Sequence, residues 1–150
     1  MNTRSDIDGF VAEKTLAVAG ISRNPQSFSA RAYEELKSKG YKLYPVNPNA
    51  PSIAGDTCYA SVGAIPQKVG GVILFTPPAV TEKVLREAVA AGIRRVWIQQ
   101  GAQDQASLRY CKEQGLAAVS GQCILMFAEP VASFHGFHRW LRKLFGGIPR

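Results

Sequence analysis

The segment TLAVAGISRNP combines residue types that could bind a phosphate group. A short apolar run ends at Gly20, where the missing side chain would let a ligand approach the backbone closely. Hydroxyl groups follow at Ser22, Ser27 and Ser29, and free amides at the start of a helix would add a positive dipole end. Arg23 could reach over the turn and bind a phosphate through two hydrogen bonds. The alternative interpretation is an ordinary strand-to-helix turn with a solvated arginine.

The same turn lacks the features of a dinucleotide-binding dehydrogenase. The pattern G-x-G-x-x-G is missing, because Gly20 is followed by Ser22 and Arg23 instead of further glycines. The acidic residue that would hold a ribose about 20 residues later is missing as well, since residues 36–55 contain no Asp or Glu. NAD is therefore disfavoured, whereas a ribose that carries a phosphate would be accommodated near Lys42.

The other reactive side chains do not form a recognisable catalytic or metal site. His135 and His138 stand three residues apart, but no third ligand has a matching spacing. The cysteines Cys58, Cys111 and Cys123 are odd in number and lack metal-ligand spacing, which indicates reduced thiols instead of disulfides. A Ser-His-Asp arrangement can be assembled only by arbitrary choice. We therefore expect neither catalytic residues nor a metal site.

Strand and helix patterns alternate along the chain and predict one doubly wound α/β domain. Nearly continuous apolar runs are typical of strands that helices cover on both faces. Strands separated by amphipathic helices predict βαβ units and a parallel sheet. Residues 61–66 hold at most a short helix. The predicted strands are 15–20, 41–48, 71–78, 94–101 and 116–121, and the predicted helices are 29–40, 79–92 and 104–115.

Small polar and turn-forming residues follow each predicted strand. Ligands of open parallel sheets bind beyond the carboxyl ends of the strands, so these residues are candidates for a binding site. None of them is a carboxylate, which suits a large, anionic and partly apolar ligand. The strand ends are Gly20-Ile21-Ser22, Asn47-Pro48-Asn49, Thr76-Pro77-Pro78, Gln99-Gln100-Gly101 and Gly121-Gln122-Cys123.

This ordered series of strand ends resembles the small stand-alone CoA-binding domain proteins, which are similar to the N-terminal CoA-binding domain of the succinyl-CoA synthetase alpha subunit. The motifs that carry the resemblance are G-x-S in AGISRNP, V-N-P in YPVNP, the proline pair in FTPP and Q-x-G in IQQG. The resemblance covers about Lys14 to Met126. It implies a Rossmann-like fold over residues 1–130 that binds coenzyme A or an acyl-CoA in an extended groove.

Carried over position by position, the resemblance implies a role for four segments and places Cys123 near the CoA thiol. Oxidation could then link the two thiols in a mixed disulfide, although a small buried core cysteine is the alternative interpretation. The implied contacts are Ser22-Arg23-Asn24-Pro25 with the phosphates, Asn47-Pro48-Asn49 near the adenosine, Thr76-Pro77-Pro78 along the ligand, and Ile98-Gln99-Gln100 near the pantetheine arm.

The chain also departs from the ligase pattern. Arg23 stands where the ligase has a glycine, Ala50 where it has a phosphate-binding lysine, and Gln100 where it has an acid. The ligase domain with the phosphorylated histidine is not seen. We therefore expect a binding or regulatory module without catalysis of its own. Two alternatives stay open: a redox or transferase protein that binds NADP or another adenine nucleotide, and an interaction protein with a vestigial pocket.

Composition and charge place further limits on the chain. It has a net charge of +7 and 46% hydrophobic residues, and no apolar segment at its N-terminus has the character of a signal peptide. We therefore expect a cytoplasmic protein. Residues 131–150 predict a basic amphipathic helical extension of the same domain. This helix could dock on the domain, across a homodimer or on a protein partner. Membrane-surface binding is a second interpretation, and nucleic-acid contact is disfavoured.

Overall fold

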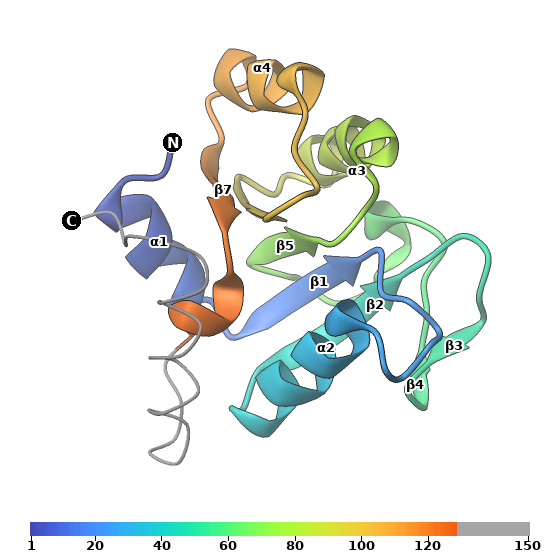
Figure 1. Cartoon of the computed structure of the whole chain (residues 1–150). Helices are drawn as coiled ribbons and strands as arrows, with labels where there is room; N and C mark the ends of the chain where they lie inside the picture. The colour runs from blue at the N-terminus through green and yellow to red at the C-terminus, as the bar shows by residue number, and fades with distance from the viewer. Residues whose placement is uncertain (129–150) are drawn as a thin grey trace.

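The computed structural model describes residues 1–128, which form a parallel sheet between two helical layers (Figure 1). The sheet has five strands in the order β2-β1-β5-β6-β7, and every neighbouring pair is parallel. The fold is Rossmann-like, as the sequence predicts. The strands are β1 (Thr15–Ala19), β2 (Lys42–Val46), β5 (Gly71–Leu74), β6 (Arg95–Gln99) and β7 (Ala117–Gln122).

Helices cover both faces of this sheet. One hydrophobic cluster joins α1, α2 and the 3₁₀-helix η2 to one face, and a second joins α3, α4 and the 3₁₀-helix η1 to the other. Figure 1 shows α1 and α2 on one side of the strands and α3 and α4 on the other. These elements are α1 (Arg4–Val11), α2 (Phe28–Ser38), η1 (Val62–Ala64), α3 (Pro78–Ala90), α4 (Gln105–Glu113) and η2 (Ile124–Met126).

The two clusters follow from the alternation of side chains along each strand. In β1, Leu16 and Val18 belong to the cluster with α2, whereas Ala17 and Ala19 belong to the cluster with α3. All four side chains are at most 1% exposed. The apolar runs predicted as strands are therefore continuous because both faces are covered.

Helix α1, a short hairpin and η2 are absent from the sequence prediction. Helix α1 buries only Ile7 and Phe10, and its start carries a reciprocal capping box between Thr3 and Asp6. The hairpin of β3 (Ser52–Ile53) and β4 (Asp56–Thr57) has strands of two residues each. Elements this short give little hydrophobic periodicity.

The predicted helical extension at 131–150, with His135 and His138, lies outside the described residues. Within residues 1–128, no helix is both long and apolar enough to cross a membrane. The same part of the chain contains no group of three or more His, Cys, Asp or Glu side chains that could hold a metal ion.

Candidate functional site

The strand order reverses direction at β1 and β5, and the loops that follow these two strands meet. In open parallel sheets ligands bind at such a switch point, because the two loops touch at the sheet edge but then lead to helices on opposite faces. Gly20 has a φ of +85°, and a Cβ at this position would lie 2.6 Å from the amide nitrogen of Thr76. Only glycine allows both this backbone conformation and this close approach.

The serine hydroxyls of the first loop shape its turn. The amide of Ser22 donates to Oγ of Ser29 at 3.0 Å, and the amide of Asn24 donates to Oγ of Ser22 at 3.1 Å. Ser27 is the N-cap of α2, and its Oγ accepts from the amide of Ala30 at 3.2 Å. The hydroxyls proposed for phosphate binding therefore already take part in local hydrogen bonds.

Arg23 connects the loop after β1 to the loop after β2. Its Nη2 donates to the carbonyl oxygen of Asn49 at 3.4 Å, and the side chain is exposed. Within the second loop, the amide of Asn49 donates to Oδ1 of Asn47 at 2.8 Å, which forms an Asx turn with Pro48 at its centre. Among residues 1–128 the guanidinium makes this one long contact, so an anion could replace it.

Three shallow cavities adjoin one another along this edge of the sheet. The arginine cavity, about 470 Å³, is lined by Ile21, Ser22, Arg23, Pro25, Arg31 and Tyr33 among others. The lysine cavity, about 450 Å³, includes Gly20, Asn47, Pro48, Asn49, Thr76, Pro77 and Lys83. The phenylalanine cavity, about 480 Å³, includes Gly20, Ser22, Phe28, Phe75, Thr76, Pro77, Gln99 and Gln100.

Shared lining residues join these cavities into one surface. Ser22 belongs to the arginine and the phenylalanine cavities, and Gly20, Thr76 and Pro77 belong to the lysine and the phenylalanine cavities. Most of the predicted site residues are therefore brought together. Asn24, Ser27, Pro78, Ile98 and Cys123 line none of the three.

Hydrogen bonds through Thr76 and Thr81 connect the loop after β5 to the loop after β6. Their Oγ1 atoms lie 2.6 Å apart, and the Thr81 hydroxyl donates to the carbonyl oxygen of Ala102 at 2.7 Å. Thr81 is fully buried and Thr76 is 4% exposed. Sequence reasoning missed Thr81, because its contribution depends on how α3 lies over both loops.

Successive side chains at the end of β6 differ in burial, with some in the core and one at the cavity surface. Ile98 is 0% exposed and packs with the helices α3 and α4. Gln99 is 4% exposed, and its Oε1 accepts from the amide of Ile124 at 3.1 Å. Gln100 is exposed. Of the three residues expected near a pantetheine arm, Gln100 is the one whose side chain is exposed at the cavity.

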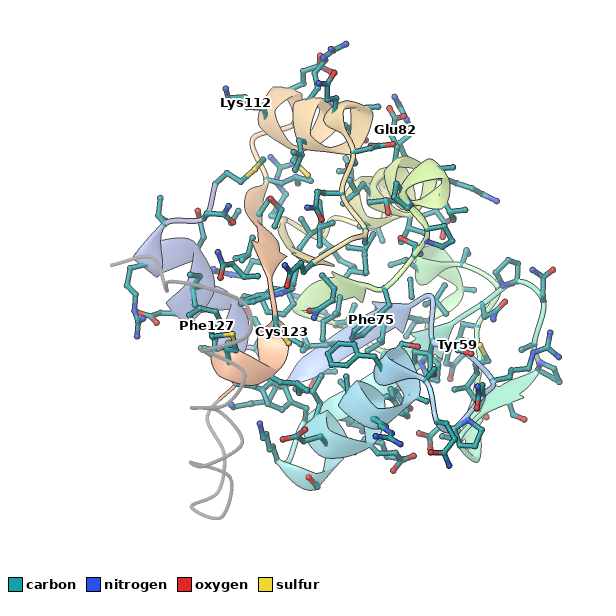
Figure 2. The ribbon with its side chains drawn as sticks, viewed as in Figure 1. Tyr59, Phe75, Glu82, Lys112, Cys123 and Phe127 are labelled. Carbon is teal, nitrogen blue, oxygen red and sulfur yellow. The ribbon has the colours of Figure 1, made fainter. Side chains whose placement is uncertain are left out.

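Cys123 occupies the core instead of the rim of the site. Its side chain is 0% exposed within the cluster that contains α1 and α2. Burial raises the pKa of the Cys123 thiol above its ordinary value, which keeps the less nucleophilic thiol form. Figure 2 shows it against the start of η2. This position corresponds to the alternative interpretation, a small core cysteine, and does not offer the thiol to a ligand at the cavity surface.

Sequence reasoning also missed Phe28, Arg31 and Lys83, all three of which are exposed side chains that line the cavities. Phe28 is the first residue of α2, and Lys83 lies in the second turn of α3. The available signal was their position, because the first turns of a helix that follows a parallel strand lie over the carboxyl edge of the sheet.

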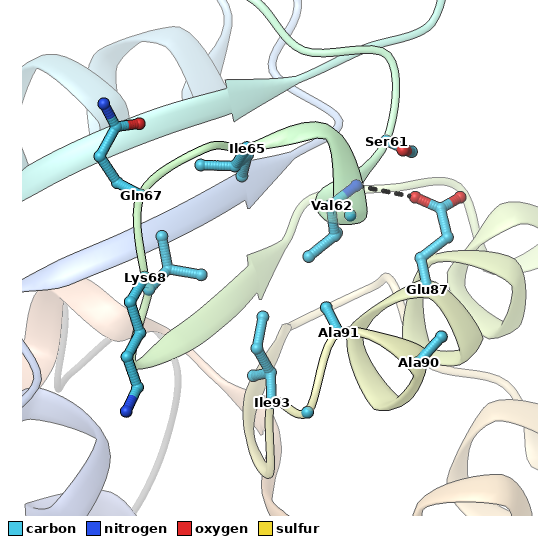
Figure 3. A pocket seen from close by; sticks show the side chains of 12 residues that line it. Ser61, Val62, Ile65, Gln67, Lys68, Glu87, Ala90, Ala91 and Ile93 are labelled. Carbon is cyan, nitrogen blue, oxygen red and sulfur yellow. Dashed lines mark hydrogen bonds between the residues drawn. The ribbon is translucent and has the colours of Figure 1, made fainter.

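A fourth cavity, of about 530 Å³, is lined almost entirely by residues that line none of these three cavities (Figure 3). Lys68, Val69 and Ile93 line it from the segments that precede β5 and β6, and Ala90 and Ala91 line it from the end of α3. Glu87 closes one side, where its Oε1 accepts from the amide of Val62 at 3.0 Å. Glu87 also lines the lysine cavity, so the two cavities meet at this side chain, although the fourth extends toward the segments that precede β5 and β6.

Comparison with known proteins identifies a matching family and several similar proteins. The family described as CoA binding domain matches residues 14–129. The ADP-forming acetate–CoA ligase II of Archaeoglobus fulgidus is 34% identical over 94 residues, which are 61% of this chain and 14% of the ligase. The chain therefore spans a small part of that relative.

Relatives of similar length also match. The uncharacterized protein YneT of Bacillus subtilis is 26% identical over 111 residues, which are 74% of this chain and 82% of YneT. The solved structure of a conserved hypothetical protein from Pyrococcus furiosus has a TM-score of 0.71 and 36% identity, and the match covers 75% of this chain and 97% of that one.

Proposed function

The chain belongs to the CoA-binding domain family, and on that premise we propose that it binds coenzyme A or an acyl-CoA across the carboxyl ends of its strands. The observation that carries the proposal is the set of three adjoining cavities at the switch point of the sheet. Coenzyme A is a long molecule, anionic at its phosphorylated adenosine and uncharged along its pantetheine arm. A continuous surface with different chemistry along its length suits such a ligand.

The phosphates belong at the arginine cavity. Arg23 and Arg31 line it, and Arg31 donates to Oε1 of Gln26 at 2.8 Å, which keeps the guanidinium beside the first loop. Guanidinium groups bind phosphate through paired charge-assisted hydrogen bonds. Glu34 is the acidic residue in the same lining. Because two arginines outnumber this one carboxylate, the lining keeps a net positive charge.

We further propose that the bound ligand is held without being transformed by this chain. The polar side chains nearest the switch point already serve the fold: Ser29 accepts from an amide of the first loop, Thr76 pairs with Thr81, and Gln99 accepts from η2. These side chains position the loops of the site, which supports a binding or regulatory role.

Calorimetry and thermal shift with CoA, acetyl-CoA, NADP and NAD test the proposal. A ligand at 100 times its dissociation constant stabilises the folded state by about 2.7 kcal/mol, so CoA and acetyl-CoA should raise the melting temperature while NAD does not. A preference for NADP would favour the adenine-nucleotide alternative. Equal effects of all four ligands, or none, would reject the CoA proposal.

A further inference from the structure

An aromatic pair stands at one end of the candidate site. Phe28, the first residue of α2, is 44% exposed, and its ring lies edge-on to that of Phe75, with centroids 6.3 Å apart and planes at 65°. Figure 2 shows Phe75 beside the first turn of α2. Both rings line the phenylalanine cavity of about 480 Å³, so an apolar group that enters it would meet two aromatic surfaces.

Charge is distributed unevenly among the three cavities. Arg23, Arg31 and Glu34 line the arginine cavity, and Lys83 and Glu87 line the lysine cavity. The phenylalanine cavity, by contrast, has no Asp, Glu, Lys, Arg or His among those of its lining residues that fall within 1–128. An anionic group placed there would lose water without gaining a partner, which is costly.

Most polar side chains of the phenylalanine cavity already have hydrogen-bond partners, and the exposed Gln100 is an uncharged amide. Ser29 Oγ accepts from the amide of Ser22 at 3.0 Å, and Thr76 Oγ1 lies 2.6 Å from Thr81 Oγ1. Gln99 Oε1 accepts from the amide of Ile124 at 3.1 Å. The cavity is therefore lined chiefly by aromatic, small and uncharged groups, which include Gly101 and Ala102.

We propose that the phenylalanine cavity receives the acyl group of an acyl-CoA, and that it selects apolar acyl groups over those that carry a carboxylate. This inference rests on the proposed function, since the same ligand places its phosphates at the arginine cavity. Phe28 is then a specificity-determining residue. An apolar acyl chain gains buried surface against the two rings, whereas the carboxylate of a succinyl group finds no cation.

Calorimetric titration of the whole chain with CoA, hexanoyl-CoA and succinyl-CoA tests the inference. Hexanoyl-CoA should bind about tenfold more tightly than CoA, which corresponds to burial of about two methylene groups. Succinyl-CoA should bind no more tightly than CoA. If none of the three ligands binds, the proposed function fails; if CoA binds but the hexanoyl group adds less than twofold, the function stands and the inference fails.

Two substitutions at one exposed position sharpen the test. Phe28→Ala should remove most of the tenfold difference in affinity between hexanoyl-CoA and CoA. Val80→Ala is the matched control, because Val80 is 40% exposed on α3 and lines the lysine cavity; it should leave the ratio unchanged. Phe28→Arg should reverse the preference and favour succinyl-CoA over CoA.

An equal loss of affinity for all three ligands in Phe28→Ala would overturn the inference, because it would mean that the rings hold a part common to them, such as the adenine. An unchanged order of preference in Phe28→Arg would overturn it as well. Thermal melts of each variant establish that it is folded, which the exposure of Phe28 leads us to expect.

Discussion

Arg23 differs from the serines around it in what its side chain is doing. Ser22, Ser27 and Ser29 all take part in hydrogen bonds that shape the first loop, whereas the exposed Arg23 reaches the second loop through one contact of 3.4 Å. A phosphate could replace that contact without disturbing the turn. At this position the chain departs from the ligase pattern, and the departure adds a cation to the proposed phosphate site.

Arg23→Ala should weaken CoA binding by about 1.5–3 kcal/mol, because a charge-assisted hydrogen bond to phosphate is lost. Calorimetry at fixed ionic strength measures the change. The control is Arg109→Ala, since Arg109 is an exposed arginine on α4 that lines none of the cavities. Equal affinities for Arg23→Ala and the unchanged chain would remove Arg23 from the site.

Gly20→Ala should destabilise the fold and weaken CoA binding together. The change adds strain at a φ of +85° and places a Cβ 2.6 Å from the Thr76 amide, so the loops after β1 and β5 must separate. We expect a loss of about 2–3 kcal/mol in the free energy of unfolding, measured by urea denaturation.

Gly40→Ala separates the cost of the positive φ from the cost of the close Cβ contact. Gly40 has a φ of +94°, but an added Cβ there meets nothing within 4 Å. The free energy of unfolding of Gly40→Ala should therefore fall only by the cost of the backbone conformation, about 1 kcal/mol. The variant should keep its affinity for CoA. If both variants lose the same stability, the close approach at Gly20 does not matter.

Among the elements, the β3–β4 hairpin owes its position to a polar cluster on α2. The Tyr33 hydroxyl donates to Oδ2 of Asp56, and Nζ of Lys37 lies 2.8 Å from the same oxygen. Burial acts to raise the pKa of Asp56, but the hydrogen bonds from Lys37 and Tyr33 outweigh burial and hold that pKa below its ordinary value. Burial and the Asp56 carboxylate raise the pKa of Tyr33, so its hydroxyl stays a donor.

Asp56→Asn should cost about 1 kcal/mol of unfolding free energy at pH 7, because Lys37 and Asp56 are each 35% exposed and solvent screens the pair. A carboxylate with a lowered pKa in the folded state stabilises the protein above its unfolded pKa, about 3.9, and loses this effect as the pH falls through the folded value. The difference between the two proteins should therefore shrink as the pH falls from the unfolded value toward the lower folded value of Asp56.

Urea denaturation across this pH range gives the measurement. Asp8→Asn serves as the control, since the Asp8 side chain is 58% exposed in its ion pair with Arg4; it should change stability by less than about 0.5 kcal/mol. A difference between Asp56→Asn and the unchanged chain that grows with acidity would contradict the assigned direction of the pKa.

Over the whole molecule, a large aromatic group joins α1 and η2 to the sheet. Trp97 is 0% exposed and packs between Phe10, at 5.5 Å between centroids, and Phe127, at 5.7 Å. Its Nε1 donates to the carbonyl oxygen of Gln122 at 3.1 Å, so the indole is satisfied although buried. Helix α1 therefore belongs to the core, despite its mostly polar sequence.

Phe10→Ala should lower the free energy of unfolding by about 3–5 kcal/mol, because it leaves a cavity against Trp97. Chemical denaturation measures this, and the fluorescence of Trp97 should report the loosened packing. Phe28→Ala makes the same chemical change at a 44% exposed position and should cost less than about 1 kcal/mol. Similar losses for the two variants would place α1 outside the cooperative core.

Elements that carry a long periodic signal could be predicted from the sequence, and shorter ones could not. The predicted helix 79–92 corresponds to α3 at Pro78–Ala90, and the predicted strand 15–20 to β1 at Thr15–Ala19. The β3–β4 hairpin and α1 carry too few apolar residues to form a pattern. Their places depend on distant partners, such as Tyr33 for the hairpin and Trp97 for α1.

The sequence by itself determined the alternation of the main strands and helices and the parallel sheet, because apolar periodicity and turn residues are local properties, and its strand-end motifs carried the resemblance to the family. Only the tertiary structure decided which side chains near the strand ends are exposed at the cavities and which are buried. Gln99 and Cys123 turn inward because η2 packs over the end of β7, whereas Phe28 and Arg31 are exposed because α2 starts at the edge of the sheet. Burial depends on contacts between segments distant in the chain, which no local pattern records.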